Sequence, residues 1–468
     1  MTAPNGSLLS APPEVRGKRV LVYSLGIEGR DLAGWLLANG ATVVISDTRS
    51  DEALAAAGAH APRGVLRLVS GEPLLDPSGY DLVAVSQSVL RYNPALQRAR
   101  ELGIPVTSQM RLFMQLCPGK TVGITGSSGK STTTALVGGM AREAGIDSIV
   151  GGNIGEALLG HLSEISPETT VILEISHTQL QYTDRSPAIA AITNITPNHL
   201  DQFSWDEYVG LKRNILAHQR RGDSAVLNAD DKTSRALMAS VKGRLVRASI
   251  LEEQPGPGAW VERGEIVVRG DGRPQPVLPV EAIRLRGQHN LANVTMACAI
   301  ASEAGIPPDA MARAIRAFTG VPHRLEVVGS VNGAAWVNDS IATSPERTIA
   351  GLRAFSEPVV LLLGGRDKNL DLDGLRELAR SRCRTVVCFG ESGDLFCTAM
   401  RGAVADCTRV NTLDEAVALA ATRTAPGDVV LLSPAGTSFD AYPNFEVRGE
   451  AFRAVVRALP GFTEEVSP

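Results

Sequence analysis

A glycine-rich turn between an apolar strand and a helix is the feature that most constrains the fold of this chain. Residues 120–126 (KTVGITG) predict a buried strand, and residues 130–145 (KSTTTALVGGMAREAG) predict the helix that follows. The turn between them contains Gly126, Gly129 and Lys130. Glycine lets backbone N–H groups approach an anion, and a helix N-terminus favours negative charge. The arrangement is typical of a parallel α/β sheet that holds a nucleotide phosphate.

The spacing of this loop differs from the common P-loop by one residue. The pattern G-x-x-x-x-G-K-[ST] requires glycine at the position of Ile124, and Gly123 lies one residue too early. Lys130 and the hydroxyl groups of Ser131 and Thr132 still fall where phosphate and Mg²⁺ would need them. We therefore expect ATP binding; the alternative is a glycine-rich turn with an exposed lysine.

Short apolar runs alternate with longer helical patterns in three successive segments. This alternation predicts an α/β fold with mostly parallel sheets. We place a Rossmann-like domain at residues 1–117, a P-loop ATPase-like domain at 118–319 and a second Rossmann-like domain at 320–468. The stretch 261–274 (VERGEIVVRGDGRP) is expected to form a small hairpin outside the main sheet. The expected strands lie within residues 19–26, 41–47, 120–126, 169–176, 188–195, 224–230, 358–368 and 428–436.

Charge and cysteine content argue against several classes of protein. The chain has 46 basic and 50 acidic side chains, with a net charge of −4 and no basic stripe, so nucleic acid is not expected as a partner. The six cysteines show no C-x-x-C spacing, which predicts neither a zinc site nor a disulfide framework. No apolar run reaches the roughly 18 residues of a membrane helix. We expect a cytoplasmic, monomeric protein without membrane association.

Acidic side chains beyond the loop are candidates for binding Mg²⁺. Glu174 lies in the apolar run 169–176, and a buried carboxylate is costly unless it is paired or bound to a metal. A buried salt bridge would satisfy it equally. The segment 194–202 (NITPNHLDQ) follows another expected strand and presents His199 and Asp201. A histidine in such a loop is more often structural than a ligand, so this motif alone predicts little.

A lysine lies on the apolar face of the next expected helix. Residues 204–207 (SWDE) have the form of a capping box, which predicts that a helix begins there. Lys212 falls on the face formed by the apolar residues of that helix. A lysine whose amine reaches out to solvent from an apolar stripe would explain this position as well as a functional role would.

The first segment carries a second, weaker nucleotide motif. Residues 24–30 (SLGIEGR) form a degenerate G-x-G-x-x-G with Ser24 in place of the first glycine, and Asp47 follows at the end of the next expected strand. The motif fits a dinucleotide, the diphosphate and ribose of another nucleotide, or a purely structural turn.

Considered together, the motifs resemble the Mur ligase family of ATP-dependent amide ligases. The resemblance covers nearly the whole chain in the family's order. It is carried by residues 125–132 (TGSSGKST), 151–155 (GGNIG), 173–176 (LEIS), 194–201 (NITPNHLD), 211–215 (LKRNI), 287–293 (GQHNLAN), 322–326 (PHRLE), 338–343 (NDSIAT), 361–368 (LLLGGRDK) and 431–449 (LLSPAGTSFD, then NFEVRG).

The resemblance implies addition of D-glutamate to UDP-N-acetylmuramoyl-L-alanine in peptidoglycan precursor synthesis. The substrate carboxylate would attack the γ-phosphorus of ATP, and the glutamate amine would then displace phosphate from the acyl phosphate, with release of ADP. The implied cofactors are ATP and Mg²⁺ at two sites, with Mn²⁺ as an alternative ion. The third domain would close on the second about a hinge near residues 318–322.

The resemblance also assigns roles to the matching residues. Lys130 would contact the ATP phosphates, Ser131 and Glu174 would bind one Mg²⁺, and His199 and a carbamylated Lys212 would serve the second. The implied ATP site comprises Gly126, Ser127, Ser128, Gly129, Lys130, Ser131, Thr132, Asn290, Asn293, Arg324 and Asp339. The implied UDP-sugar site comprises Ile27, Glu28, Asp47, Thr48, Arg49 and Asn153, and the implied glutamate site comprises Thr343, Lys368, Ser438 and Phe445.

The sequence departs from the family pattern at several positions near these sites. Ser128 stands where most relatives have asparagine, and Ile341 where many have lysine. Residues 85–89 (VSQSV) replace S-P-G-[IV], and residues 174–181 (EISHTQLQ) replace E-L-S-S-F-Q-L-E. Because of these departures, the sequence specifies the reaction more firmly than it specifies the residues that contact the substrate.

Other functions remain open from the residues alone. Within the family, the alternatives are a ligase for another amino acid such as L-glutamate, one with a different carboxylate acceptor, or one that extends folate-type polyglutamate. Outside it, the first segment alone would fit a dinucleotide-dependent oxidoreductase, and the loop alone would fit a switch-type NTPase or a kinase. Only a ligase should require an amino acid for ADP release.

Overall fold

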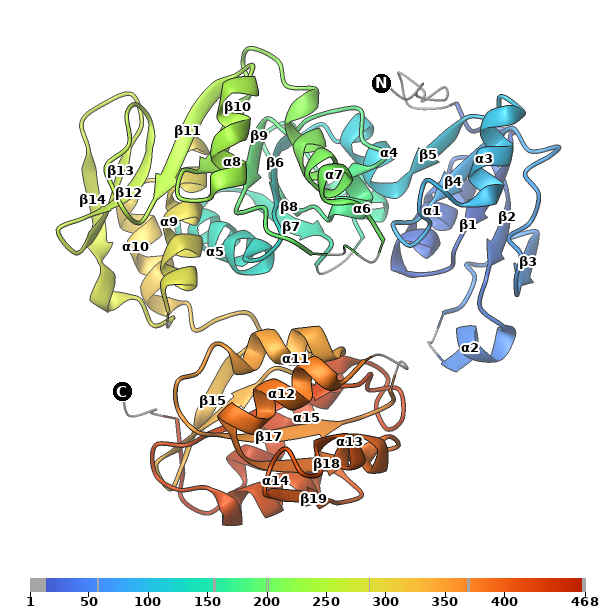
Figure 1. The fold of residues 1–468 in the computed structure, drawn as a ribbon. Coiled ribbons are helices and arrows are strands. Elements are labelled where there is room, and N and C mark those ends of the chain that lie inside the picture. Colours follow the sequence, from blue (N-terminus) through green and yellow to red (C-terminus); the bar gives the residue numbers. More distant parts are fainter. Residues whose placement is uncertain are drawn as a thin grey trace. The chain divides into compact units, whose positions relative to one another are not determined.

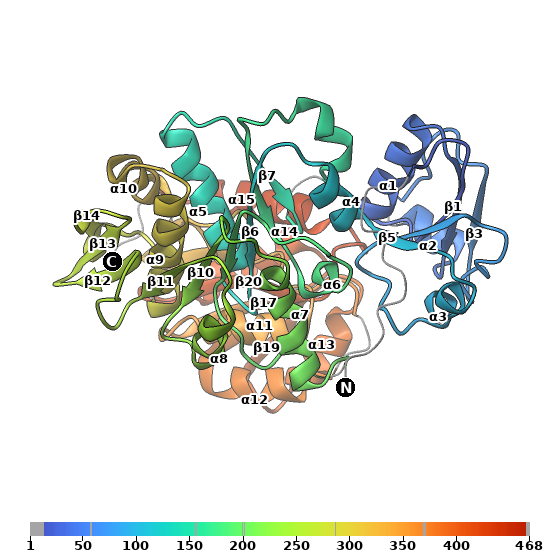
Figure 2. The same ribbon diagram turned by 90° about the horizontal axis from the view of Figure 1, so that it is seen from above.

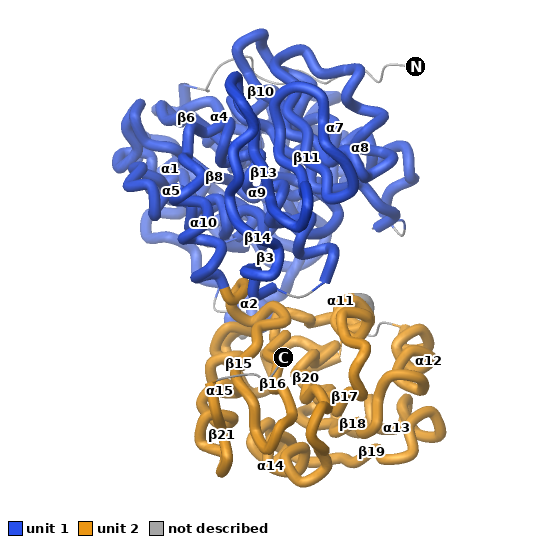
Figure 3. The backbone as a smooth tube through the Cα atoms, turned by 90° about the vertical axis from the view of Figure 1, so that its left-hand side faces the viewer, with its two compact units in different colours: residues 1–318 blue, residues 319–468 orange. Residues whose placement is uncertain are grey.

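The computed structural model describes residues 14–56, 59–154, 157–198, 200, 202–285, 287–367 and 371–464. The chain divides into two compact units, residues 1–318 and 319–468 (Figure 3). The first unit contains two sheets and the second unit contains one (Figure 1). In the described part of the chain, no helix is both long and apolar enough to cross a membrane. The α/β fold with mostly parallel sheets that we expected is confirmed.

The first sheet has five parallel strands in the order β3-β2-β1-β4-β5. The turn from β1 into α1 needs glycine, because a Cβ on Gly29 would lie 1.8 Å from the carbonyl oxygen of Ser24, which itself has φ 74°. The elements are β1 (Arg19–Tyr23), α1 (Ile27–Ala38), β2 (Thr42–Asp47), α2 (Asp51–Ala56), β3 (Arg67–Ser70), β4 (Leu82–Val85), α3 (Pro94–Glu101), β5 (Val106–Ser108) and α4 (Gln109–Leu116).

The central sheet has nine strands in the order β14-β13-β12-β11-β10-β9-β6-β8-β7. Its strands are β6 (Lys120–Thr125), β7 (Ser148–Gly152), β8 (Thr170–Glu174), β9 (Ile189–Ile192), β10 (Ser224–Asn228), β11 (Arg244–Ser249), β12 (Gly258–Glu262), β13 (Glu265–Arg269) and β14 (Gln275–Pro279). Its α-helices are α5 (Lys130–Glu143), α6 (His177–Leu180), α7 (Trp205–Ala217), α8 (Lys232–Leu237), α9 (Gln288–Glu303) and α10 (Pro308–Ala317), with 3₁₀ helices at Leu159–Glu164, Met238–Ser240 and Val280–Ala282.

The hairpin of β12 and β13 belongs to this main sheet, so our expectation that it would lie outside is wrong. The two strands are antiparallel, as a hairpin requires. However, β12 also pairs in parallel with β11, with Arg247 opposite Gly258. A Cβ on Gly258 would lie 2.2 Å from the carbonyl oxygen of Arg247. Glycine therefore allows the close approach that adds the hairpin to the sheet.

Helices cover both faces of the central sheet. Helices α5, α9 and α10 pack on one face around a buried apolar cluster that includes Val122, Met140 and Ile300 (Figures 1 and 2). Helix α7 packs on the other face, where Leu211 and Ile215 join a cluster that continues into the first sheet's helices. The first sheet and the central sheet therefore share this apolar cluster.

The second unit has a seven-stranded sheet in the order β19-β18-β17-β20-β16-β15-β21. The strands from β19 to β16 are parallel, whereas β15 and β21 add an antiparallel edge. Helices α11, α12 and α13 cover one face, and α14 and α15 cover the other. The elements are β15 (Glu326–Val331), β16 (Ala334–Asn338), α11 (Pro345–Leu352), β17 (Val359–Gly364), α12 (Asp373–Arg382), β18 (Cys383–Phe389), α13 (Gly393–Met400), β19 (Asp406–Arg409), α14 (Leu413–Arg423), β20 (Val429–Ala435), α15 (Phe445–Arg457) and β21 (Phe462–Thr463).

Candidate functional site

The glycine-rich loop lies at the carboxyl edge of the central sheet, after β6. The neighbouring strands β8 and β9 are parallel to β6, so the segments that follow all three strands meet at the same edge. Gly126 has φ 155° and Gly129 has φ 79°. A Cβ on Gly126 would lie 1.9 Å from Thr193 Oγ1, and one on Gly129 would lie 2.1 Å from Asn293 Oδ1. Only glycine therefore fits at these two positions.

The segment after β9 fixes the backbone of this loop. Thr193 Oγ1 donates to the carbonyl oxygen of Ser128 at 2.6 Å, and the Ser128 N–H donates to Asn194 Oδ1 at 3.0 Å. The Ser127 N–H donates to the carbonyl oxygen of Asn194 at 2.9 Å. The amide of Asn194 also donates to Ser128 Oγ at 3.1 Å. Both the backbone and the side chain of Ser128 are thus held by Asn194.

Two lysines converge on one carbonyl group of the loop. Lys130 Nζ and Lys212 Nζ each donate to the carbonyl oxygen of Gly126 at 2.8 Å, and Lys212 Nζ also donates to Thr125 Oγ1 at 3.1 Å. Lys212 is 1% exposed. Burial lowers the pKa of Lys212 well below 10.5, and the charge of Lys130 lowers it further, while Glu174 acts in the opposite direction. The lowered pKa shifts the Lys212 amine toward its neutral form.

The position of Lys212 excludes the alternative that its amine reaches solvent. Helix α7 begins after Ser204, whose side chain accepts from the Glu207 N–H while the Glu207 carboxylate accepts from Ser204, as the capping box predicted. Lys212 lies on the buried face of that helix, with Nζ 5.5 Å from the centre of the Tyr208 ring. The Tyr208 hydroxyl in turn lies 3.0 Å from Ser127 Oγ. Helix α7 therefore connects the lysine directly to the loop.

Glu174 places a buried carboxylate beside the two lysines. It ends β8 opposite Ile124 of β6, and it is 2% exposed. Its Oε1 atom accepts from Asn153 Nδ2 at 2.7 Å. Its Oε2 atom is buried and has no hydrogen-bond partner within the described ranges. No salt bridge of Glu174 is found among the described residues, so the carboxylate has unused capacity for a cation.

Helix α9 brings two asparagines to the loop. Asn293 is buried against Gly129, and its Nδ2 atom donates to Asn290 Oδ1 at 3.3 Å. Asn290 lies in the first turn of the helix. The structure therefore joins this part of the implied ATP site to the phosphate loop.

The first sheet forms a separate acidic site at the end of β2. Asp47 Oδ2 accepts from the Leu25 N–H at 2.6 Å and from Arg49 Nη2 at 2.7 Å. Burial alone would raise the pKa of Asp47, but the hydrogen bonds from Arg49 and Leu25 outweigh it and lower the pKa to about 2. The neighbouring side chains of Ile27 and Thr48 are exposed. A fixed anion beside exposed side chains suits a small polar ligand.

Glu28 connects the first domain to the central domain. Its Oε2 atom accepts from the Gln87 N–H at 2.6 Å, and its Oε1 atom accepts from Gln179 Nε2 at 2.6 Å. Gln87 Oε1 in turn accepts from Ser176 Oγ at 2.8 Å and from Thr178 Oγ1 at 3.4 Å. Gln87 and Thr178 therefore contact each other between the first sheet and the central sheet.

In the second unit, a buried arginine holds together three segments that contain predicted glutamate-binding residues. Arg448 on α15 donates to Ser340 Oγ at 3.0 Å, to the Ser340 carbonyl at 2.9 Å and to the Gly436 carbonyl at 3.1 Å. Ser340 Oγ donates to the carbonyl oxygen of Phe445 at 2.8 Å. The segments that carry Thr343, Ser438 and Phe445 are thus held at the carboxyl ends of β16 and β20.

Asp339 is a buried titratable group of that unit with a strongly perturbed environment. Ser433 Oγ donates to its Oδ2 atom at 2.8 Å, and the Leu325 N–H donates to its Oδ1 atom at 3.2 Å. Burial raises the pKa of Asp339 to about 7, and its hydrogen bonds and the charges of Arg324 and Arg347 act in the opposite direction. Arg324 and Asp339 therefore lie close together, as the sequence assignment of both to one site requires.

The raised pKa of Asp339 predicts a pH-dependent stability. The folded state keeps the Asp339 proton up to about pH 7, whereas the unfolded state releases it near 3.8, so this contribution to stability is lost as pH rises through that window. We expect the Asp339→Asn variant to lose less free energy of unfolding than the wild type between pH 5.5 and pH 8. Urea unfolding at both pH values measures this difference, and the exposed Asp414→Asn serves as control. Equal pH dependence in all three proteins would contradict the assignment.

Two regions of the chain match known domain families. Residues 124–301 match the Mur ligase middle domain, and residues 323–436 match the Mur ligase glutamate ligase domain. The chain is also 40% identical to the UDP-N-acetylmuramoylalanine--D-glutamate ligase of Symbiobacterium thermophilum, over 94% of this chain and 98% of that protein. The chain belongs to the Mur ligase family. A protein of the same name from Acidobacterium capsulatum is 39% identical to this Mur ligase over 96% of the chain and 98% of that relative.

The fold is also that of solved Mur ligases. The UDP-N-acetylmuramate-alanine ligase of Thermotoga maritima superposes with a TM-score of 0.57 at 18% identity, covering 93% of this chain and 98% of that one. A pseudomurein peptide ligase type C from Methanothermus fervidus gives a TM-score of 0.52 at 17% identity, covering 94% and 99%. At this level of identity, the similarity to these two structures shows a shared fold and nothing further.

Two residues that the sequence assigned to this Mur ligase site, His199 and Lys368, lie outside the described residues, as does Asp201. Around the loop, the structure brings together Lys130, Lys212, Glu174 and Asn293. Sequence reasoning missed Thr193 and Asn194, although both lie beside or within the quoted motif NITPNHLD. Their position directly after the strand next to the loop was the available signal.

Proposed function

We propose that this chain joins D-glutamate to UDP-N-acetylmuramoyl-L-alanine in an ATP-dependent, ADP-forming reaction of peptidoglycan precursor synthesis. The observation that carries the proposal is the convergence of Lys130 and Lys212 on the Gly126 carbonyl. The charge of Glu174 acts on Lys212, and the Glu174 Oε2 atom has no hydrogen-bond partner among the described residues. The substrate assignment is supported by relatives of that name that are 36–40% identical over nearly their full length.

The loop supplies the groups that a triphosphate needs. Its fixed backbone, the N-terminus of α5 and the Lys130 amine present donors and positive charge toward a phosphate chain. Thr193 and Asn194 hold this backbone in place before the nucleotide arrives. Catalysis of phosphoryl transfer depends mainly on positioning and charge stabilisation, and this loop is arranged for both.

The residues around Glu174 fit a hard cation. Its unpartnered Oε2 atom and the hydroxyl of Ser131, which is 6% exposed on the first turn of α5, are oxygen ligands of the kind Mg²⁺ prefers. When bound, Mg²⁺ supplies positive charge that neutralises the transferring phosphoryl group. We assign a second Mg²⁺ site to His199 and a carbamylated Lys212, and Mn²⁺ is expected to substitute at both sites.

The reaction then proceeds in two steps. The terminal carboxylate of the substrate attacks the γ-phosphorus, ADP leaves, and an acyl phosphate forms; Lys130 stabilises the charge on the transferring group. The neutral amine of glutamate attacks the acyl carbon, and phosphate leaves.

We assign recognition of the uridine nucleotide to the site around Asp47 and Arg49, with Asn153 nearer the acyl centre. We assign nucleotide contacts to Arg324 and Asp339, and recognition of glutamate to Lys368, Thr343, Ser438 and Phe445. We further propose a cytoplasmic monomer.

Replacement of Glu174 should affect the metal dependence most. Because a glutamine side chain at this position carries no negative charge, the Glu174→Gln variant is expected to need at least about tenfold more Mg²⁺ for half-maximal activity. Titration of activity with Mg²⁺ at saturating ATP measures this shift. The exposed Glu168→Gln, in the turn before the same strand, is the matched control. An unchanged Mg²⁺ requirement in Glu174→Gln would remove Glu174 from the metal site.

The proposed function is tested by ADP release from purified protein. UDP-N-acetylmuramoyl-L-alanine is supplied alone, with D-glutamate or with L-glutamate, and the product is identified by mass spectrometry. We expect ADP release to require both the nucleotide substrate and D-glutamate. Turnover with L-glutamate instead would favour the alternative amino-acid specificity. ADP release that depends on neither glutamate would contradict the ligase assignment.

A further inference from the structure

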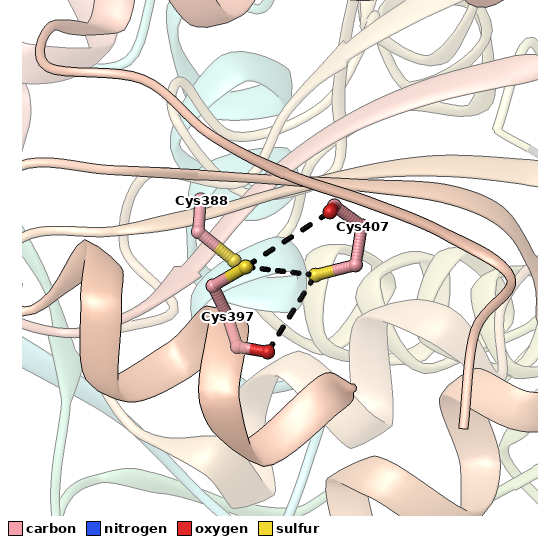
Figure 4. Close-up of side chains that lie close together, drawn as sticks. All are labelled: Cys388, Cys397 and Cys407. Atoms are coloured by element: carbon pink, nitrogen blue, oxygen red, sulfur yellow. Dashed lines mark hydrogen bonds between the residues drawn. The ribbon is translucent and has the colours of Figure 1, made fainter. Parts of the chain in front are cut away.

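Three cysteines of the second unit converge from three different elements. Cys388 lies on β18, Cys397 on α13 and Cys407 on β19, and their side chains point toward one another (Figure 4). The three Sγ atoms all lie within 4.8 Å of one another, and those of Cys397 and Cys407 are 3.4 Å apart. No short motif in the sequence signals this cluster, because the pairing of the strands brings the residues together.

The spacing of the sulfur atoms fits a shared metal ion. A metal at about 2.3 Å from each of three thiolates holds the sulfur atoms about 3.8–4.0 Å apart. The Cys397 and Cys407 sulfur atoms, 3.4 Å apart, lie slightly closer than that value, and the other two pairs lie within 4.8 Å, so small side-chain movements suffice. A disulfide would instead need two sulfur atoms about 2.05 Å apart and would leave the third thiol without a role.

The surroundings favour a thiophilic ion over a hard one. Cys388 is fully buried, Cys397 is 7% exposed and Cys407 is partly exposed, which gives an entry path from the side of Cys407. Within the described ranges, no histidine or carboxylate joins the group, so Mg²⁺ would find no anionic oxygen ligand there. A divalent ion on three thiolates leaves one negative charge, and Arg401 interacts with both Cys397 and Cys407.

We propose that Cys388, Cys397 and Cys407 bind one thiophilic metal ion of the Zn²⁺ class, with water as the fourth ligand. Binding releases the thiol protons to solvent and ties β18, β19 and α13 together, so its effect is on the stability of the second unit.

The experiment uses the full-length protein, reduced and freed of metal by a chelator. Equilibrium dialysis against micromolar Zn²⁺ with elemental analysis is expected to give one Zn²⁺ per chain, and Cd²⁺ should give a thiolate charge-transfer band. Bound Zn²⁺ should protect the three cysteines from alkylation, read out by peptide mass spectrometry. The variants C388S, C397S and C407S should each lose the bound equivalent, whereas C383S, on the same strand as Cys388, should keep it.

A second measurement separates loss of the site from loss of the fold. Zn²⁺ should raise the melting temperature of the wild type and of C383S in a concentration-dependent way, and should not raise that of the cluster variants. No retained Zn²⁺ in the wild type, equal retention in the cluster variants, or alkylation of the three cysteines that Zn²⁺ does not slow would each overturn the proposal. A Cys397–Cys407 disulfide in place of metal binding would do so as well. None of these readouts depends on ligase activity.

Discussion

Replacement of Lys130 by alanine is expected to lower kcat by about 10³-fold or more. The Lys130 amine is a cation of the glycine-rich loop, and loss of one such group that stabilises developing charge typically costs about 10²–10³ in rate, and more for phosphoryl transfer. Initial rates of ADP release at saturating substrates measure kcat. Because the loop backbone is held by Thr193 and Asn194, the variant should keep its fold.

The exposed Lys120→Ala, at the start of β6, the strand that leads into the loop, is the control for this experiment and should keep full activity. Lys130→Arg should recover only part of the rate, because a planar guanidinium cannot occupy the place of a compact amine beside Gly126. If Lys130→Ala kept kcat within a few fold of the wild type, the loop would not be the site of phosphoryl transfer.

The local pattern of the sequence was enough to predict the loop. Strand β6, the turn and α5 are consecutive in the chain, and Gly126 and Gly129 are each required by a contact that a Cβ would block. Glu174 was also correctly predicted to be buried, because it is a charged residue within an apolar strand pattern. For Lys212 the sequence left open an amine that reaches solvent, and the structure buries it instead. The periodicity of apolar residues predicts burial well, because the buried side chains of a strand or helix lie on one of its faces.

Contacts between distant segments could not be predicted in this way. The support of the loop by Asn194 depends on β9 lying next to β6, although β7 and β8 come between them in the chain. The cluster of Cys388, Cys397 and Cys407 likewise forms only once β18 pairs with β19 and α13 packs against them. The hairpin error had the same origin, because residues 261–274 were interpreted as a hairpin outside the main sheet while β12 in fact pairs with β11. Strand order is a property of the whole sheet.

Replacement of Lys212 by alanine is expected to lower kcat by about 10³-fold, with partial rescue by a short carboxylic acid such as formate or acetate. Burial and the charge of Lys130 lower the pKa of Lys212 and so shift its amine toward the neutral form, and a neutral amine can add to CO₂ to give a carbamate and a proton. The carbamate carries the negative charge that a second Mg²⁺ needs. ADP release with and without added carboxylate measures the rescue.

The lowered pKa of Lys212 also predicts how the stability of the protein depends on pH, independently of catalysis. In CO₂-free buffer, the unfolded state keeps the Lys212 proton up to about pH 10.5, whereas the folded state releases it at a lower pH, so stability rises with pH between these two pKa values. Lys212→Met should therefore be more stable than the wild type near pH 7, and the difference should shrink toward pH 10.5. Urea unfolding at several pH values measures it.

Arg213→Ala, the next residue along the same helix and exposed, is the control for both measurements and should change neither activity nor pH dependence. If Lys212→Ala kept full activity without carboxylate, the carbamate would have no role. If Lys212→Met lost activity but removed no pH dependence of stability, the amine would be protonated in the folded protein, and Lys212 would serve the phosphates as a second cation beside Lys130. The two measurements together therefore distinguish a carbamate from a cation at the position where the chain buries this lysine against its own phosphate loop.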